Sequence, residues 1–496
     1  MTPDRERRTR LPARLPSRRL RRRHRRAASA ALAALGAFLI AGALAPAAAD
    51  AHGISGLASL PVPAWLFAWA AAIVLVVSFV LLSTLWSQPR LQGGHERRLC
   101  GWPRALEPLA GAVGIALLAL VVYAGYAGSS IYTSNLDPTF IYVVFWVGVP
   151  VFSVLLGNWF AAFSPWRALA RLAAWAWRRA GGPRRPPLTY PARLGRWPAA
   201  AGIVCFAWLE LVYHDHDVPS LLASLTVAYT AIMLTGIALF GSEQWSERGD
   251  AFGVYFNLLG RLAPLEVRDG ALWLRRPLSG VTSLAQIPGT TAVVLAVIGT
   301  TTFDGASNGV VWETLQPHVQ SFFTGPLGLG DKPGDELADS LGLLLALLVV
   351  TAFWRVGVLG MRSVSRRMSA GELSRTFAHT LVPIAFAYVL AHYFSLLIWQ
   401  GQAIGYLASN PLGDGSDYLG TAHWHIHYDV LSFNAIWYVQ VAALVIGHVC
   451  GLALAHDRAL VVFRSPRQAV QSQYWMLVVM VGFTSLGLWL LSSVNT

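Results

Sequence analysis

The chain has 496 residues, of which 55% are hydrophobic and only 13% are charged, and its mean hydropathy is +0.50. Because soluble globular proteins contain about 25% charged residues, this composition excludes an ordinary cytosolic enzyme. The net charge of +13 is concentrated at the start of the chain, where residues 1–26 contain twelve Arg and two acidic residues. The rest of the chain has 26 basic and 23 acidic residues, so we expect no nucleic-acid partner.

The first 51 residues have the composition of a secretory signal peptide. An unusually long Arg-rich segment precedes an apolar Ala- and Leu-rich stretch at residues 27–49, and Ala49-Asp50-Ala51 fits a small-x-small cleavage site. Cleavage there would leave His52 as the mature N-terminus. An uncleaved signal anchor is the alternative, but the small residues at the end of the apolar stretch favour cleavage.

Ten further stretches are long and apolar enough to cross a bilayer as helices. We therefore expect an all-α integral membrane protein, with residues 52–496 forming a single bundle of about ten transmembrane helices. The predicted spans lie near residues 62–86, 106–129, 141–163, 198–213, 220–242, 284–303, 340–361, 376–400, 433–456 and 473–493.

The distribution of charge predicts the orientation of this bundle. If His52 lies outside, the five inward segments contain 25 of the 26 basic residues of the mature chain, and only Lys332 lies outside. The outward segments contain twelve Asp and Glu residues. This division follows the positive-inside rule and predicts a multi-pass protein of the bacterial plasma membrane with both mature termini outside.

Four segments between the spans have distinct compositions. Residues 164–197 contain eight Arg and no acid, which is typical of a basic cytoplasmic linker near anionic lipid. Residues 243–283 form the next cytoplasmic loop, in which the alternation around Asp269-Gly270 favours a small β-hairpin over 264–276. Residues 304–339 and 401–432 are Gly- and Pro-rich, and we expect them to be outer loops.

Histidines and carboxylates from different spans gather on the predicted outer side. The run 213–217 (YHDHD) ends the fourth span, and the run 423–429 (HWHIHYD) precedes the ninth. Imidazole and carboxylate ligands bind divalent Zn, Fe, Mn, Ni or Cu, and the few Cys residues argue against a thiolate site. The predicted metal ligands are His214, His216, Asp304, His392, His423, His425 and His427. The predicted catalytic acids are Glu210, Asp215, Asp217 and Asp429.

The spacing of these residues permits two geometries. In an extended segment, residues 423, 425, 427 and 429 project from one face, whereas in a helix they divide into two i,i+4 pairs. Glu210 and His214 are also spaced i,i+4 on the predicted fourth span. The Glu210 carboxylate lies about one turn inside the membrane, where an ionisable group usually faces a cavity or a partner.

Other interpretations of the histidines stay open at this point. The loop histidines can be solvated side chains without a metal, or they can hold a purely structural ion that clamps the loops. His379, His448 and His456 near the inner side fit polar pairing between helices. The amine and imidazole of a mature N-terminal His52 could chelate Cu(II).

Three stretches of the chain resemble a family of actinobacterial-type membrane proteins. They are His52-Gly-Ile-Ser-Gly followed by Leu60-Pro-Val-Pro-Ala-Trp-Leu-Phe, the run NLLGRLAPLEVRDGALWLRRPLSG at 257–280, and HWHIHYD at 423–429. The family is named fenitrothion hydrolase, after a membrane-embedded enzyme that hydrolyses an organophosphorus triester. The similarity extends over most of the mature chain, in the order of the spans and the composition of the loops. It provides no pattern of catalytic residues that could be assigned to this chain.

The resemblance implies a metal-dependent hydrolase of an aryl phosphotriester, a small lipophilic substrate that partitions into the lipid bilayer. A divalent ion held by the outer histidines would lower the pKa of bound water and polarise the phosphoryl oxygen. Asp215, Asp217, Asp304 or Asp429 could bridge a second ion or accept the proton of the water.

Two other functions fit the same residues. The first is transport or capture of a transition metal, with Glu210, His392, His448 and His379 marking a path inward. The second is an assembly factor for a copper enzyme, which depends on His52. A transporter needs these groups along one continuous cavity, whereas a hydrolase needs a closed pocket at one face. The oligomeric state is open.

Overall fold

The computed structural model describes residues 64–92, 96–103, 105–183 and 185–493. The predicted signal peptide and its cleavage before His52 lie outside these residues. The described part of the chain is mostly helical, with three short strands.

Among the described residues, eight helical stretches are long and apolar enough to cross a membrane, by length and composition. Six of them are single continuous helices, and the other two are interrupted by changes of helix type. The continuous helices are α2 (Ala64–Leu85), α3 (Leu106–Ala127), α9 (Pro219–Phe240), α15 (Asp331–Val364), α19 (Phe433–Val462) and α20 (Pro466–Ser493).

The two interrupted stretches change helix type along their length. The first, Leu136–Leu156, consists of α4 (Leu136–Thr139), the π-helix η2 (Phe140–Gly148) and α5 (Val149–Leu156). The second, Ala370–Leu407, consists of α16 (Ala370–Phe377), η3 (Ala378–Leu381), α17 (Val382–Trp399), η4 (Gln400–Gln402) and α18 (Ala403–Leu407). A π-helix is rare and often accompanies a functional site.

The other two predicted spans are helices that differ from a standard membrane span. Helix α8 (Trp197–Leu211) has 15 residues and is about 22 Å long, which is short of a hydrocarbon core of about 30 Å. Helix α13 (Thr290–Ser307) contains five Thr and is mostly buried by its neighbours. The polar threonine side chains of α13 are therefore surrounded mostly by protein and not by lipid.

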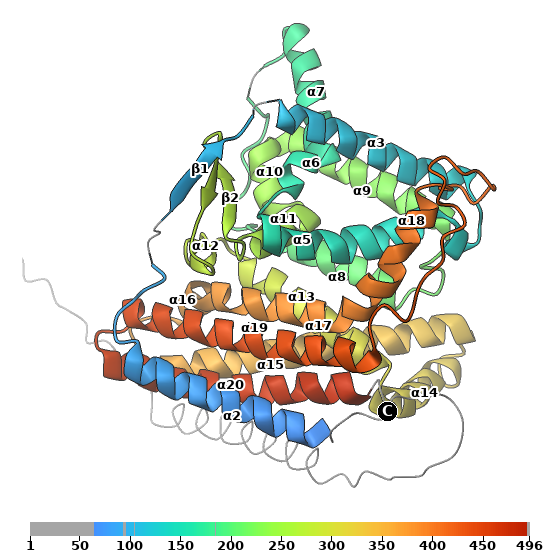
Figure 1. Cartoon of the computed structure of the whole chain (residues 1–496). Helices are drawn as coiled ribbons and strands as arrows, with labels where there is room; N and C mark the ends of the chain where they lie inside the picture. The colour runs from blue at the N-terminus through green and yellow to red at the C-terminus, as the bar shows by residue number, and fades with distance from the viewer. Residues whose placement is uncertain (1–63, 93–95, 104, 184, 494–496) are drawn as a thin grey trace, which may run out of the picture. The chain divides into compact units, whose positions relative to one another are not determined.

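The helices pack in two groups (Figure 1). In one group α13 packs against α15 and α17, and α20 packs against α2, α15 and α19. In the other, α3 packs against α9 and α7 (Pro165–Arg179), and α11 (Ala251–Gly260) packs against α5 and α8. Contacts of α13 with α8, and of α17 with η2, join the two groups.

The segments between the spans also contain helices. The predicted outer loop 304–339 includes the end of α13, helix α14 (Val310–Thr324) and the first turns of α15. The predicted inner loop 243–283 includes most of α10 (Ser242–Arg248), the buried apolar helix α11 and the short helix α12 (Ser279–Thr282). The remaining short elements are η1 (Tyr132–Ser134) and α6 (Phe160–Phe163).

A three-stranded antiparallel sheet lies in the strand order β1-β3-β2. Strands β2 (Leu265–Arg268) and β3 (Ala271–Leu274) are joined at Asp269-Gly270, where both residues have positive φ as a tight two-residue hairpin requires. Strand β1 (Arg97–Gly101) adds to β3 from far along the chain.

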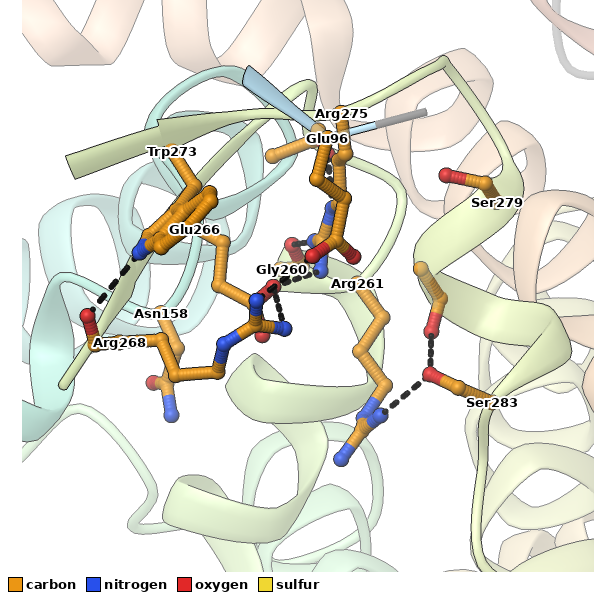
Figure 2. A network of polar contacts seen from close by, with 12 residues as sticks. Glu96, Asn158, Gly260, Arg261, Glu266, Arg268, Trp273, Arg275, Ser279 and Ser283 are labelled. Atoms are coloured by element: carbon orange, nitrogen blue, oxygen red, sulfur yellow. Dashed lines mark hydrogen bonds and ion pairs between the residues drawn. The ribbon is translucent and has the colours of Figure 1, made fainter. Parts of the chain in front are cut away.

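Figure 2 shows the polar network that attaches this sheet to α11. Buried Arg275 donates from Nε to the Ala263 carbonyl at 2.8 Å and from Nη2 to the Gly260 carbonyl at 2.9 Å. Its Nη1 lies 3.3 Å from Glu266 Oε2. Arg268 pairs with Glu96 at 2.6 Å, which connects the end of β2 to the residue before β1.

Candidate functional site

The most completely built polar centre joins α13 to α17. Asp304 Oδ2 lies 2.9 Å from His392 Nε2 and accepts a hydrogen bond from the Tyr393 hydroxyl at 2.6 Å. The Asp304 side chain is 14% exposed and the His392 side chain 24% exposed. A carboxylate that accepts from an imidazole and a phenol at once is held in one position inside the helix bundle.

The packing of α13 against α17 explains why these groups meet. Asp304 lies in the last turn of α13, and His392 and Tyr393 lie past the middle of α17, so the direct packing of these helices brings them together. The neighbour of Asp304 is Gly305, and a Cβ built on it would lie 3.6 Å from His392 Nδ1. The second nitrogen of the imidazole therefore faces a side of α13 that carries no side chain.

A cavity of about 120 Å³ adjoins His392. It lies among α13, α17, α19 and α20, and its polar lining is Thr301, Thr302, Tyr388, His392, Ser395 and Gln440. Because one water needs only about 10–15 Å³ by this measure, the cavity has room for several waters or a hydrated ion. It is much smaller than the roughly 300–1,000 Å³ of a typical organic-ligand pocket.

Polar groups continue from this cavity along α17 and α19. Tyr388 lines the cavity, and its ring centroid lies 6.0 Å from that of His448. His448 is fully buried, its Nδ1 is 2.8 Å from the Leu444 carbonyl, and its Nε2 has no hydrogen-bond partner. The groups His392, Tyr388 and His448 therefore form a row inside the bundle.

Glu210 lies on α8, which packs against α13. Its Oε2 atom is buried without a hydrogen-bond partner. The predicted i,i+4 pair with His214 is wrong, because α8 ends at Leu211. The helix closes there when the amides of Val212 and Tyr213 both bond to the Trp208 carbonyl, so His214 lies in the following turn.

His214 pairs with acids that begin α15. Its Nε2 lies 3.1 Å from Asp335 Oδ2 and its Nδ1 lies 3.4 Å from Glu336 Oε1. The neighbouring Asp215 lies 3.5 Å from the Lys332 amine. The turn at 213–217 is therefore attached to the N-terminal turns of α15.

His216 faces η2 instead. The His216 carbonyl accepts a hydrogen bond from the Tyr142 hydroxyl at 2.7 Å, and its ring Nδ1 lies 2.9 Å from the Tyr213 carbonyl. Asp217 follows in the same turn and is partly buried.

The HWHIHYD segment is an irregular loop with exposed side chains. His423, His425, His427 and Asp429 are all exposed, and residues 424–427 belong to no helix or strand. The segment is fixed through its backbone, because Gln402 bonds both the amide and the carbonyl of His427 at 3.1 and 3.0 Å. Ile426 packs against the apolar cluster around Leu407.

A second anchor of this loop is Asp417. Its Oδ1 accepts from the Ser409 hydroxyl and from the Ala422 amide, and these hydrogen bonds hold the pKa of the Asp417 carboxyl below its usual value. Ser409 Oγ accepts in turn from the amides of Leu419 and Thr421.

The structure thus distributes the predicted site residues over three places. Asp304 and His392 meet inside the bundle, and Glu210 is buried on α8, which packs against α13. The 213–217 turn contacts α15 and η2, and the 423–429 segment lies in an exposed loop. Within the described ranges, no three or more His, Cys, Asp or Glu side chains are grouped so that they could hold a metal ion.

Four residues of these polar groupings were not singled out from the sequence as site residues. Tyr393 follows His392 directly but has no distinguishing pattern, and Asp335 and Glu336 belong to the predicted outer loop 304–339. Asp137 is one of the twelve acidic residues of the predicted outward segments, and the structure buries it fully. A carboxylate inside the boundary of an apolar stretch is the signal that could have found it.

Comparison of the chain with protein-family models, with curated proteins and with solved structures finds no match.

Proposed function

We propose that this chain is a multi-pass membrane protein that transports a small cation through a centre formed by Asp304, His392 and Tyr393. The observation that carries the proposal is the buried carboxylate–imidazole–phenol cluster beside a cavity of about 120 Å³. Ionisable groups within membrane spans are costly and usually mark the pathway of an ion or a proton.

The chemistry of the centre defines the class of cation. A carboxylate oxygen and an imidazole nitrogen bind either a proton or a first-row divalent ion of the group Zn, Fe, Mn, Ni and Cu. The size of the cavity supports such an ion and argues against a larger organic solute. The row from His392 through Tyr388 to His448 supports an inward continuation of the path.

The orientation belongs to the same proposal. The Arg-rich segments would face the cytoplasm and the His-rich turns the outside, so that the exposed histidines of 423–429 collect cations near the outer ends of α17 and α19. In this scheme His214, His216, His423, His425 and His427 are capture groups, and the intramembrane centre is the transport site.

Transport by the full chain in sealed proteoliposomes tests the proposal. An internal pH dye and an internal metal-sensitive dye distinguish proton from metal entry. We expect Asp304→Asn and His392→Gln to reduce entry on the order of tenfold or more, because each removes one ligand of the centre. His318→Gln is the matched control, since this exposed histidine bonds only its own helix through Thr314.

Entry at the wild-type rate in both centre variants would exclude the proposed path. Absence of proton and metal entry in the wild-type protein would exclude transport of this class of cation altogether.

A second candidate is hydrolysis of an aryl phosphotriester, to which the resemblance points. One observation favours it: Asp304 orients the His392 ring while His392 Nδ1 faces the cavity side, which is the arrangement of a general base that deprotonates water. Because the cavity is too small for the triester, the substrate would have to open it.

Release of nitrophenol from an aryl phosphotriester by the purified protein tests this candidate. Suppose that His392→Gln loses nitrophenol release, while the wild-type protein keeps it after metal ions are chelated. That result would support Asp304 and His392 as a general base that works without a metal. Loss on chelation and in His425→Ala would support a metal centre at the outer loop. No release by the wild-type protein would exclude hydrolysis.

A further inference from the structure

Asp137 is a completely buried carboxylate at the start of the interrupted span Leu136–Leu156. Its side chain is 0% exposed, and neither Oδ1 nor Oδ2 has a hydrogen-bond partner. An ionised carboxylate in such surroundings is strongly destabilising unless a cation or a proton neutralises it. The Asp137 carboxylate therefore needs a cation or a proton that the neighbouring side chains do not supply.

The backbone around Asp137 is fixed closely. Asn135, also fully buried, accepts a hydrogen bond from the Asp137 amide at 3.0 Å and donates to the carbonyls of Ala124 and Ser129. A Cβ built on Gly125 would lie 3.2 Å from Asp137 Cγ and 2.8 Å from the Pro219 carbonyl oxygen. A larger residue at Gly125 would collide here, so α3 and α9 both approach the carboxylate closely.

The elements packed against α4 provide no cation to pair with Asp137. Those elements are α3, α9, α18, η1 and η2, and their only charged residue is Glu107, at the far end of α3. The surrounding elements therefore offer Asp137 no partner of opposite charge.

Tyr142, which follows Asp137 on η2, lies between α8 and the outer turn 213–217. Its ring centroid lies 6.0 Å from that of Phe206 on α8 and 6.3 Å from that of His216. Its hydroxyl donates to the His216 carbonyl at 2.7 Å. The interrupted span that begins at Asp137 is therefore bonded to the outer turn.

We infer that Asp137 is a proton-binding residue, whose buried carboxyl takes up and releases a proton during transport. This role extends the proposed function and rests on it. Each transfer breaks an O–H bond on the donor and forms one on the accepting oxygen, so no oxidant or other reactant is needed.

The alternative explanation is structural. Asp137 lies in the first turn of a helix, where a negative charge is stabilised by the helix dipole. If Asp137 had that role, its replacement would change the stability of the protein but would change neither proton exchange nor transport.

Infrared difference spectra of the purified full chain in lipid, recorded as a function of pH, distinguish the two explanations. We expect a C=O stretching band of a protonated buried carboxyl that titrates in the wild type and is lost in Asp137→Asn. Asp137→Glu keeps the carboxyl and should shift the band. Asp331→Asn is the matched control, because Asp331 is an exposed acid in the first turn of α15.

Transport is measured on the same variants in the proteoliposome assay. We expect Asp137→Asn to reduce proton entry on the order of tenfold, and Asp331→Asn to leave it unchanged. An unchanged spectrum together with unchanged transport in a folded Asp137→Asn protein would overturn the inference. If the wild type transports nothing but the Asp137 band titrates, proton binding by Asp137 stands while the proposed function fails.

Discussion

At the scale of single residues, Arg275 shows how one buried side chain can connect several segments. Its guanidinium bonds two carbonyls at the end of α11 and the following turn, and it pairs with Glu266 on β2. Burial lowers the pKa of Arg275, and nearby Glu266 opposes this shift. The ordinary pKa of arginine is so high that the group stays charged at neutral pH.

We predict that Arg275→Gln lowers the stability of the protein by about 1–3 kcal/mol, because it leaves the buried carbonyls of Ala263 and Gly260 without their donors. Thermal denaturation in detergent measures the change. Arg276→Gln is the control, since Arg276 is the exposed neighbour. Equal melting temperatures for the two variants would contradict this role of Arg275.

Asp417 provides a prediction of pH dependence outside the membrane spans. Because its hydrogen bonds to Ser409 and Ala422 lower the pKa of the folded state, they stabilise the loop above the unfolded pKa of about 3.9. This stabilisation is lost as the pH falls through the lower pKa of the folded protein.

We therefore expect protease cleavage within residues 413–432 to increase below about pH 4 in the wild type, and at neutral pH in Asp417→Asn. Limited proteolysis with an acid-stable protease measures it. Glu313→Gln, which alters an exposed acid on α14, should cleave like the wild type. A wild-type pattern in Asp417→Asn would show that this carboxylate does not anchor the loop.

At the scale of elements, close packing of α17 on α19 determines where His392 lies. A Cβ built on Gly447 of α19 would lie 2.2 Å from Ala387 Cβ and 2.9 Å from the Pro383 carbonyl oxygen. Small residues at such a crossing allow two membrane helices to approach closely.

We predict that Gly447→Ala destabilises the protein by about 1–3 kcal/mol, because the added methyl group has to separate α17 from α19. Gly482→Ala on α20 is the control, since its Cβ would make only an ordinary contact of 3.5 Å with Phe353. Thermal denaturation of both variants provides the test, and a neutral Gly447→Ala would show that the helices can separate without cost.

The elements also show which features of the fold the local sequence predicts and which it does not. Hydropathy predicts a helix at each of the ten stretches, yet in the part of the chain that the structure describes eight helical stretches are long and apolar enough to span a membrane. Helix α8 ends at Leu211, where the amides of Val212 and Tyr213 both bond to the Trp208 carbonyl. No residue pattern in the sequence predicts this end. Alternation around Asp269-Gly270 favours a hairpin at β2 and β3, whereas the addition of β1 joins residues that are far apart in the chain.

At the scale of the whole molecule, the distribution of Arg predicts which ends of the helices face the cytoplasm. Native Cys100 on β1 is exposed, and it belongs to a predicted inner segment. Leu419 is 67% exposed and belongs to a predicted outer loop.

We expect a membrane-impermeant maleimide to label Leu419→Cys on intact cells, and to label Cys100 only after permeabilisation. Wild-type protein, which lacks a thiol in the 401–432 loop, is the control. The reverse pattern of labelling would show that the bundle has the opposite orientation.

Composition and hydropathy alone determine that this is a helical protein suited to a membrane, because burial in lipid constrains each stretch of about twenty residues independently. They also single out Asp304, His392 and Glu210 as chemically unusual positions. They do not determine which polar groups meet. The pairing of Asp304 with His392 and Tyr393, and the seclusion of Asp137 beside α3 and α9, depend on the rotation and close approach of helices that are distant in sequence. Those features are decided by packing, and packing exists only in the tertiary structure.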